Sequence, residues 1–184
     1  MTQYVKIPPR ERIGVIIGPK GEIKKLIEDK TTCQLEIESD SGKIDVTCEG
    51  DPLKEFRVLE TIKAIGRGFS PEKALEILDD EMLMLEVIDL SDVATTPKEL
   101  QRIKGRIIGR NGRTRELAES LINVKISVYG KTVSVLGYPP EQNTIIRTAI
   151  KMLLDGATHG AVYKFLEKKH QELLHSQLDS VDFY

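Results

Sequence analysis

The sequence is poor in the residues that disulfide frameworks and metal centres need. It contains two cysteines, Cys33 and Cys48, and three histidines among 184 residues. Two cysteines are too few for a disulfide framework, and free cysteines are usually small buried core residues, so we expect both to be unpaired in a core. Histidines at metal-ligand spacing, Cys-x-x-Cys pairs and nucleotide-binding glycine motifs are lacking, and His170 and His175 are expected on a solvated surface. The sequence therefore favours a protein that is not an enzyme and uses no metal or cofactor.

Long apolar stretches are lacking too. No run approaches the roughly 18 apolar residues that a membrane helix needs. The first residues, MTQYVKIPPRE, contain no apolar signal-peptide core. We therefore expect a cytoplasmic protein, and a reducing compartment argues against a structural disulfide.

A global excess of positive charge is also absent, because the net charge is −2. The cations are concentrated locally instead. Between Lys98 and Arg115 seven lysines and arginines accompany a single acid, Glu99. Salt limits the reach of a charge to about 8–10 Å, so an approaching phosphate responds to this local cluster rather than to the net charge.

An internal repeat organises the chain. The segments IGVIIGPKGEIKKLIED and KGRIIGRNGRTRELAES align at one offset, since residues 18 and 109 are 91 positions apart. Hydrophobic spacing predicts the same order in both copies: a strand, two helices, a strand hairpin and a long helix. The predicted strands cover residues 4–7, 34–38 and 43–48, then 83–90, 124–128 and 132–136. The predicted helices cover residues 10–17, 22–30 and 53–65, then 97–108, 113–121 and 139–154.

Two further helices are predicted outside the repeat. One covers residues 70–79 between the copies, and the other covers residues 157–174, followed by a polar tail. We therefore expect an α+β protein with a first domain and linker helix at residues 1–79, a second domain at 80–156, and a C-terminal helix and tail at 157–184. Each domain would consist of a three-stranded antiparallel sheet covered by helices.

Each copy places a Gly-x-x-Gly sequence between two predicted helices. Glycine lets the backbone turn sharply and approach a ligand closely, and the amino end of the following helix favours anions. A basic residue inside each loop, Lys20 or Arg110, adds positive charge. One such loop is weak evidence for a binding site, but two in the same predicted frame indicate contact with a sugar-phosphate backbone.

At these residues the sequence resembles the KH domain of the type with β-α-α-β-β-α order, because IIGPKG and IIGRNG match its signature loop. The resemblance implies a narrow groove for single-stranded RNA, with the loop and its helices on one side and the first hairpin strand on the other. The RNA-binding residues that we expect are Gly18, Pro19, Lys20, Gly21, Lys24, Arg106, Gly109, Arg110, Asn111, Gly112, Arg113 and Arg115, together with the apolar residues Ile17, Ile37, Ile108, Ile126 and Val128.

A closer resemblance covers nearly the whole chain. The segments GRNGRT, RGFSPEKAL and HGAVYKFLE are similar to those of the archaeal and eukaryotic pre-rRNA-processing KH proteins of the Pno type. This resemblance implies a role in small-ribosomal-subunit assembly, with binding near the 3′ end of the small-subunit rRNA. It implies a PIN-domain rRNA endonuclease as a partner and, for archaeal members, the α subunit of translation initiation factor two. The full Gly-x-x-Gly in the first copy points to the archaeal branch, because eukaryotic members tend to have a degenerate first loop.

A protein-interaction scaffold with idle KH grooves is the alternative. An apolar stripe in the last predicted helix would either bind a partner or pack on the second domain; it comprises Val162, Phe165, Leu166 and Leu173. Around the first loop, Glu11 and Glu22 accompany the cations. We therefore expect the second copy to contribute more of the electrostatic affinity for RNA.

Overall fold

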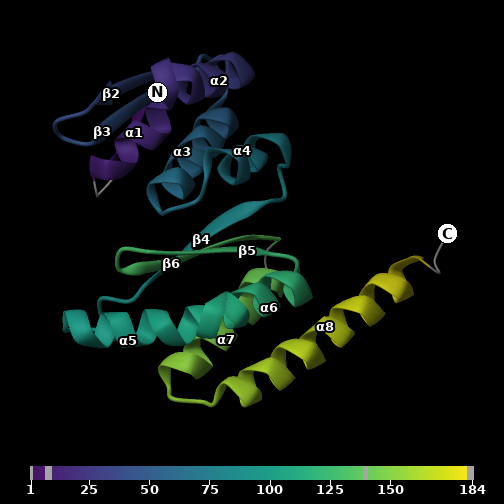
Figure 1. Cartoon of the computed structure of the whole chain (residues 1–184). Coiled ribbons are helices and arrows are strands. Elements are labelled where there is room, and N and C mark those ends of the chain that lie inside the picture. Colours follow the sequence, from purple (N-terminus) through teal and green to yellow (C-terminus); the bar gives the residue numbers. More distant parts are fainter. Residues whose placement is uncertain (1, 7–9, 139–140, 182–184) are drawn as a thin grey trace. The chain divides into compact units, whose positions relative to one another are not determined.

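The computed structural model describes residues 2–6, 10–138 and 141–181, and the chain divides into two compact units, Met1–Leu85 and Glu86–Tyr184. Each unit has a three-stranded antiparallel sheet with helices against it (Figure 1). This is the α+β arrangement that the repeat predicts. Within the described residues no helix is both long and apolar enough to cross a membrane.

The first unit begins with β1 (Thr2–Lys6), and a 3-10 turn (Arg10–Arg12) leads into the short helix α1 (Ile13–Ile17). The remaining elements are α2 (Glu22–Thr31), β2 (Gln34–Glu38), β3 (Lys43–Thr47), α3 (Pro52–Gly66) and α4 (Pro71–Asp79). Its sheet has the order β1-β3-β2. The predicted elements agree within a few residues, although Ile7, the end of the first predicted strand, lies outside the described residues.

The second unit contains β4 (Met84–Asp89), α5 (Pro97–Ile108), α6 (Arg113–Ile122), β5 (Lys125–Tyr129), β6 (Thr132–Gly137), α7 (Glu141–Leu154) and α8 (His159–Val181). Its sheet has the equivalent order, β4-β6-β5. The first two residues of the helix predicted at 139–154 fall outside the described residues. The predicted polar tail is a correction, because α8 continues to Val181 in a stretch that has no glycine or proline to end it.

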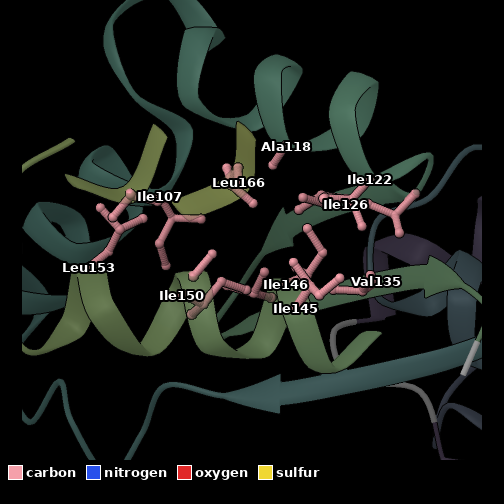
Figure 2. Packing of buried hydrophobic residues seen from close by; sticks show 14 of the residues in the cluster. Ile107, Ala118, Ile122, Ile126, Val135, Ile145, Ile146, Ile150, Leu153 and Leu166 are labelled. Atoms are coloured by element: carbon pink, nitrogen blue, oxygen red, sulfur yellow. The ribbon is translucent and has the colours of Figure 1, made fainter. Parts of the chain in front are cut away.

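The core of the second unit lies between the sheet and its helices (Figure 2). Ile107 of α5, Ile122 of α6, Ile126 of β5 and Ile146 of α7 are all buried in one cluster. Leu166, which is fully buried, brings α8 into the same cluster. The helix on either side of the second Gly-x-x-Gly loop is therefore anchored by packing, which fixes where the loop is presented.

The helices α4 and α8 take equivalent places in the two units. Each follows the third helix of its unit; α4 packs on α2 and α3, and α8 packs on α6 and α7. Each starts with a matching bond, Ala74 N to Ser70 O at 3.0 Å and Val162 N to Thr158 O at 3.2 Å. Both helices lie outside the repeat in sequence, yet they pack on matching helices of their units. Few side chains are identical in these segments, but the unit that repeats is β-α-α-β-β-α-α.

The two cysteines form a disulfide bond in the first unit. Cys33 precedes β2, Cys48 follows β3, and their Cα atoms are 4.3 Å apart. Both are buried, as the sequence predicts, but the expectation that they are unpaired is wrong. The pairing of neighbouring strands β2 and β3 brings these distant sequence positions together, and spacing in the sequence alone does not show this.

Candidate nucleic-acid interface

The two Gly-x-x-Gly loops have the same backbone conformation. In the first, Gly18, Lys20 and Gly21 have φ angles of 73°, 53° and 81°. The corresponding angles at Gly109, Asn111 and Gly112 are 77°, 54° and 79°. A non-glycine residue in the left-handed region is uncommon, so its occurrence at the same place in both loops marks a shared and constrained turn.

The first glycine of each loop is required by close packing as well as by its φ angle. A Cβ atom at Gly18 would lie 2.9 Å from Ile23 Cβ, and one at Gly109 would lie 2.8 Å from Thr114 Cβ. By contrast, nothing lies within 4 Å of such an atom at Gly21. The first glycine therefore lets the backbone rest directly on the following helix, whereas the second serves the turn.

The side chains of both loops are presented at the surface. Pro19, Lys20, Arg110 and Asn111 are exposed, as is Arg113 at the start of α6. Among the described residues, Lys20, Arg110 and Arg113 have no hydrogen bond or ion pair. These three cations can therefore meet a phosphate without first breaking an internal contact.

A groove of about 430 Å³ runs along α5 beside the second loop. It is lined by Pro97, Leu100, Gln101, Lys104, Gly105 and Ile108. Lys104 donates to the carbonyl of Gly130 at 3.2 Å, so its side chain reaches from α5 to the turn between β5 and β6. The site residues expected from the sequence did not include Leu100 and Lys104. These residues precede Ile108 by eight and four positions, so all three lie on one helix face.

Each edge strand is held by a glutamate from the preceding helix. Glu28 Oε1 accepts from Leu35 N at 2.9 Å, and Glu119 Oε1 accepts from Ile126 N at 2.8 Å. Because the backbone groups of alternate strand residues face the same edge, the N–H and C=O groups of Ile37 and Val128 also point outward from β2 and β5. These are the positions where the edge of a base can find backbone donors and acceptors.

The apolar site residues divide into two groups. Ile17, Ile37, Ile108 and Val128 are half-buried, which leaves part of each side chain at the surface. Ile126 is a correction, because its side chain is only 7% exposed and packs in the core of the second unit. Its burial follows from its place near the middle of β5 on the face that the helices cover, so it supports the site from below and does not present a surface to a base.

The side chain of Arg106 makes hydrogen bonds within the second unit. Its Nε donates to Leu153 O at 3.2 Å, and its Nη2 donates to Ala157 O. Arg12 makes the equivalent clamp in the first unit, with Nε donating to Ile65 O at 2.9 Å. The guanidinium of Arg106 thus caps the carboxyl end of α7, a stabilising place for a cation, and a direct contact with RNA remains a prediction.

Lys24 and Arg115 occupy matching positions in the two copies. Lys24 lies 3.8 Å from Glu28, and Arg115 lies 3.9 Å from Glu119, in each case as an i,i+4 pair. Their partners are the glutamates that hold the edge strands. Both cations are therefore partly neutralised, in contrast to Lys20, Arg110 and Arg113.

The apolar stripe of α8 mostly serves the second unit. Val162 and Leu166 are buried at 1% and 0% exposure, while Phe165 and Leu173 are half-buried at a hollow of about 620 Å³ beside α7. His170 is also engaged, because its Nδ1 is 2.7 Å from Leu121 O. The expectation of a solvated His170 is wrong, and packing of the stripe on the second unit is confirmed for Val162 and Leu166.

Comparison with family models supports the same division of the chain. Residues 2–64 match the model described as the KH domain. Residues 84–171 match the model described as the eukaryotic type KH-domain (KH-domain type I).

Curated relatives are similar to this chain in sequence, and solved structures are similar to it in sequence and fold. A KH domain-containing protein of Methanocaldococcus jannaschii is 42% identical over 183 residues, which cover 96% of this chain and 78% of that protein. The crystal structure of Dim2p from Pyrococcus horikoshii has a TM-score of 0.84 and 44% identity, covering 91% of this chain and 99% of that one. Dim2p in a complex with a/eIF2α and rRNA from the same organism has a TM-score of 0.86 and 43% identity, covering 94% and 95%. The pre-rRNA-processing protein PNO1 of Chaetomium thermophilum is 33% identical over 107 residues, 57% of this chain and 41% of that protein.

Proposed function

Because the chain belongs to the Pno1/Dim2-type family of KH-domain proteins, we propose that it binds single-stranded rRNA near the 3′ end of the small-subunit molecule during ribosome assembly. The observation that carries this proposal is the presentation of two identical Gly-x-x-Gly turns with unpaired cations at the surface. The complex of the similar Dim2p with rRNA supports it.

In the second unit, different residues are proposed to contact the phosphates, the base faces and the base edges. Arg110 and Arg113 flank the amino end of α6, where unpaired backbone N–H groups and the helix dipole attract a phosphate. Half-buried Leu100 and Ile108 offer an apolar surface for bases. The outward backbone groups of Val128 offer hydrogen bonds to base edges. A groove of this kind accepts unpaired nucleotides, about four in each KH domain.

The second unit is proposed to carry most of the electrostatic affinity. Its loop has two exposed cations without partners, Arg110 and Arg113. Lys20 and Lys25 are exposed near the first loop, but Glu11 and Glu22 are exposed there as well. Since phosphate contacts dominate the affinity of nucleic-acid binding, the difference predicts unequal grooves.

Two protein partners belong to the same proposal. The α subunit of translation initiation factor two is supported by the complex in which the similar Dim2p is bound to a/eIF2α. A PIN-domain rRNA endonuclease is proposed from the resemblance of the sequence to the Pno type. In this scheme the protein acts as the RNA-binding component in the cytoplasm, and cleavage is the partner's activity.

The proposal is tested by titrating the protein into fluorescently labelled RNA with the sequence of the rRNA 3′ end. The variant Arg110→Asp/Arg113→Asp should lose at least tenfold in affinity, and Lys20→Asp/Lys25→Asp should lose less. A matched control is Lys164→Asp/Lys168→Asp on α8. A duplex of the same sequence should bind weakly, because bases in a duplex are not available to the groove.

The alternative function is a scaffold whose grooves are idle. A variant that combines Lys20→Asp and Arg110→Asp distinguishes the two functions. Unchanged RNA affinity in this variant would favour the scaffold. If an RNA of shuffled sequence bound as tightly as the rRNA 3′ end, the protein would still bind RNA, but the rRNA 3′ end would not be its specific target.

A further inference from the structure

The outer face of α5 carries two cations that the groove does not use. Lys98 and Arg102 are exposed, and among the described residues neither has a hydrogen bond or ion pair. They are separated by four residues, so they lie on the same helix face. That face is turned away from Ile103 and Ile107, which are buried in the core. In the described part of the second unit, neither cation has an acidic partner.

This face leads directly to the second loop. Gly105 lies three residues beyond Arg102, is exposed, and would have nothing within 4 Å of an added Cβ atom. The helix surface between Arg102 and the loop is therefore open. From Lys98 to Ile108 the helix rises by about 15 Å, so the face extends well beyond the second loop.

The acid beside these cations is occupied elsewhere. Glu99 Oε2 accepts from Thr95 N and Thr96 N, both at 3.1 Å, and from Thr95 Oγ1 at 3.0 Å. These bonds hold the carboxylate at the start of the helix as part of a capping box. It makes no ion pair with Lys98 or Arg102 in the structure.

The first unit provides an internal comparison. Its position equivalent to Arg102 is Glu11, 91 residues earlier, which is exposed. The position equivalent to Lys98 is residue 7, which lies outside the described residues. The two units therefore differ in charge at this position, and the cation is found beside the second loop.

We propose that Lys98 and Arg102 form a phosphate-binding track on α5, which holds the single-stranded RNA that flanks the nucleotides in the second groove. The inference rests on the proposed function and adds to it a footprint longer than the four nucleotides of one KH groove. Both cations bind phosphates without reading bases, so the track extends affinity rather than sequence preference.

The test compares two RNA lengths. Lys98→Gln/Arg102→Gln and the control Lys164→Gln/Lys168→Gln are titrated with a 4-nucleotide and a 10-nucleotide RNA of the same central sequence. The track predicts that the first variant loses about 10- to 30-fold in affinity for the longer RNA at 0.1 M salt, with a salt slope smaller by about 1.4, from about 0.7 for each phosphate contact. Affinity for the 4-nucleotide RNA should not change, and the control should match the unmodified protein with both RNAs.

Three results would overturn the track. The first is equal affinity of variant and control for the longer RNA. The second is an equal loss for both RNA lengths, which would place the effect in the groove. The third is that the unmodified protein binds neither RNA, in which case the proposed function fails together with the track. If only the track fails, the unmodified protein and both variants still bind the 10-nucleotide RNA. Thermal unfolding of both variants confirms that they are folded, and if the double variant is not, Arg102→Gln alone is tested with a slope change of about 0.7 expected.

Discussion

The hydroxyl groups of Thr114 in α6 and Tyr163 in α8 are 2.9 Å apart and share a hydrogen bond. Thr114 is the residue on which the backbone of Gly109 rests. The bond therefore links the C-terminal helix to the foundation of the second Gly-x-x-Gly loop. In the first unit the equivalent positions hold Ile23 and Leu75, which cannot form such a bond.

Tyr163→Phe tests whether this bond positions the loop. Removing the phenolic hydroxyl should lower the free energy of unfolding by about 1 kcal/mol, the usual contribution of one hydrogen bond. It should also weaken RNA binding by a few-fold at a temperature where the variant is fully folded, because Thr114 is freed to change rotamer under Gly109. Chemical denaturation and RNA titration give the two values.

A double-mutant cycle with Thr114→Val shows whether Thr114 and Tyr163 act on RNA binding together or independently. The two single variants and the double variant should lose similar affinity, because either change breaks the same bond. Additive losses, or full RNA affinity in Tyr163→Phe, would show that the bond has no part in positioning the loop.

The glycine pairs predict an ordered series of stabilities. Gly21→Ala should lower the free energy of unfolding by about 1–2 kcal/mol, the cost of a left-handed conformation for a residue with a Cβ atom. Gly18→Ala should cost more, because its Cβ atom also meets Ile23 and its ψ of 173° lies in a region open mainly to glycine. Urea denaturation measures both, and a larger loss for Gly21→Ala would contradict the packing account.

The hydrogen bonds of Arg106 predict that its substitution destabilises the protein, whether or not Arg106 contacts RNA. Arg106→Gln removes charged hydrogen bonds to two carbonyls at the end of α7, and should lower the free energy of unfolding by about 1.5–3 kcal/mol. Arg12→Gln should behave alike in the first unit, since it makes the matching clamp. Denaturation of both variants checks this. If Arg106→Gln left stability unchanged but abolished RNA binding, Arg106 would be a ligand contact rather than a clamp.

The capping box predicts an acid-sensitive start of α5. Hydrogen bonds from the Thr95 hydroxyl and the Thr96 backbone lower the pKa of Glu99 from its ordinary value. A lowered pKa means that Glu99 stabilises the folded state above the unfolded pKa, and that this stability is lost as the pH falls through its lower folded pKa. A carboxyl titration followed by NMR should find the pKa of Glu99 below the usual value for a glutamate. Thr95→Ala should raise its pKa, and an unchanged value would refute the assignment.

The repeat and its hydrophobic spacing determined the two β-α-α-β-β-α frames, because a Gly-x-x-Gly turn between amphipathic helices is a local pattern. The same local signals gave the exposed loop cations. They could not give the equivalence of α4 and α8, which rests on backbone geometry and on matching helix contacts with few identical side chains. The sequence also did not predict the disulfide, because it is the pairing of β2 with β3 that brings Cys33 and Cys48 together.

For the site, the sequence determined which residues carry charge, while tertiary structure decided which charges are available. Arg106 and Arg110 are the same residue type four positions apart, yet one clamps the end of α7 and the other is free at the surface. Ile108 and Ile126 differ in the same way, one half-buried and the other in the core. The reason is physical: a side chain's type sets what it can bind, but only its neighbours in the fold determine whether another group has already bound it.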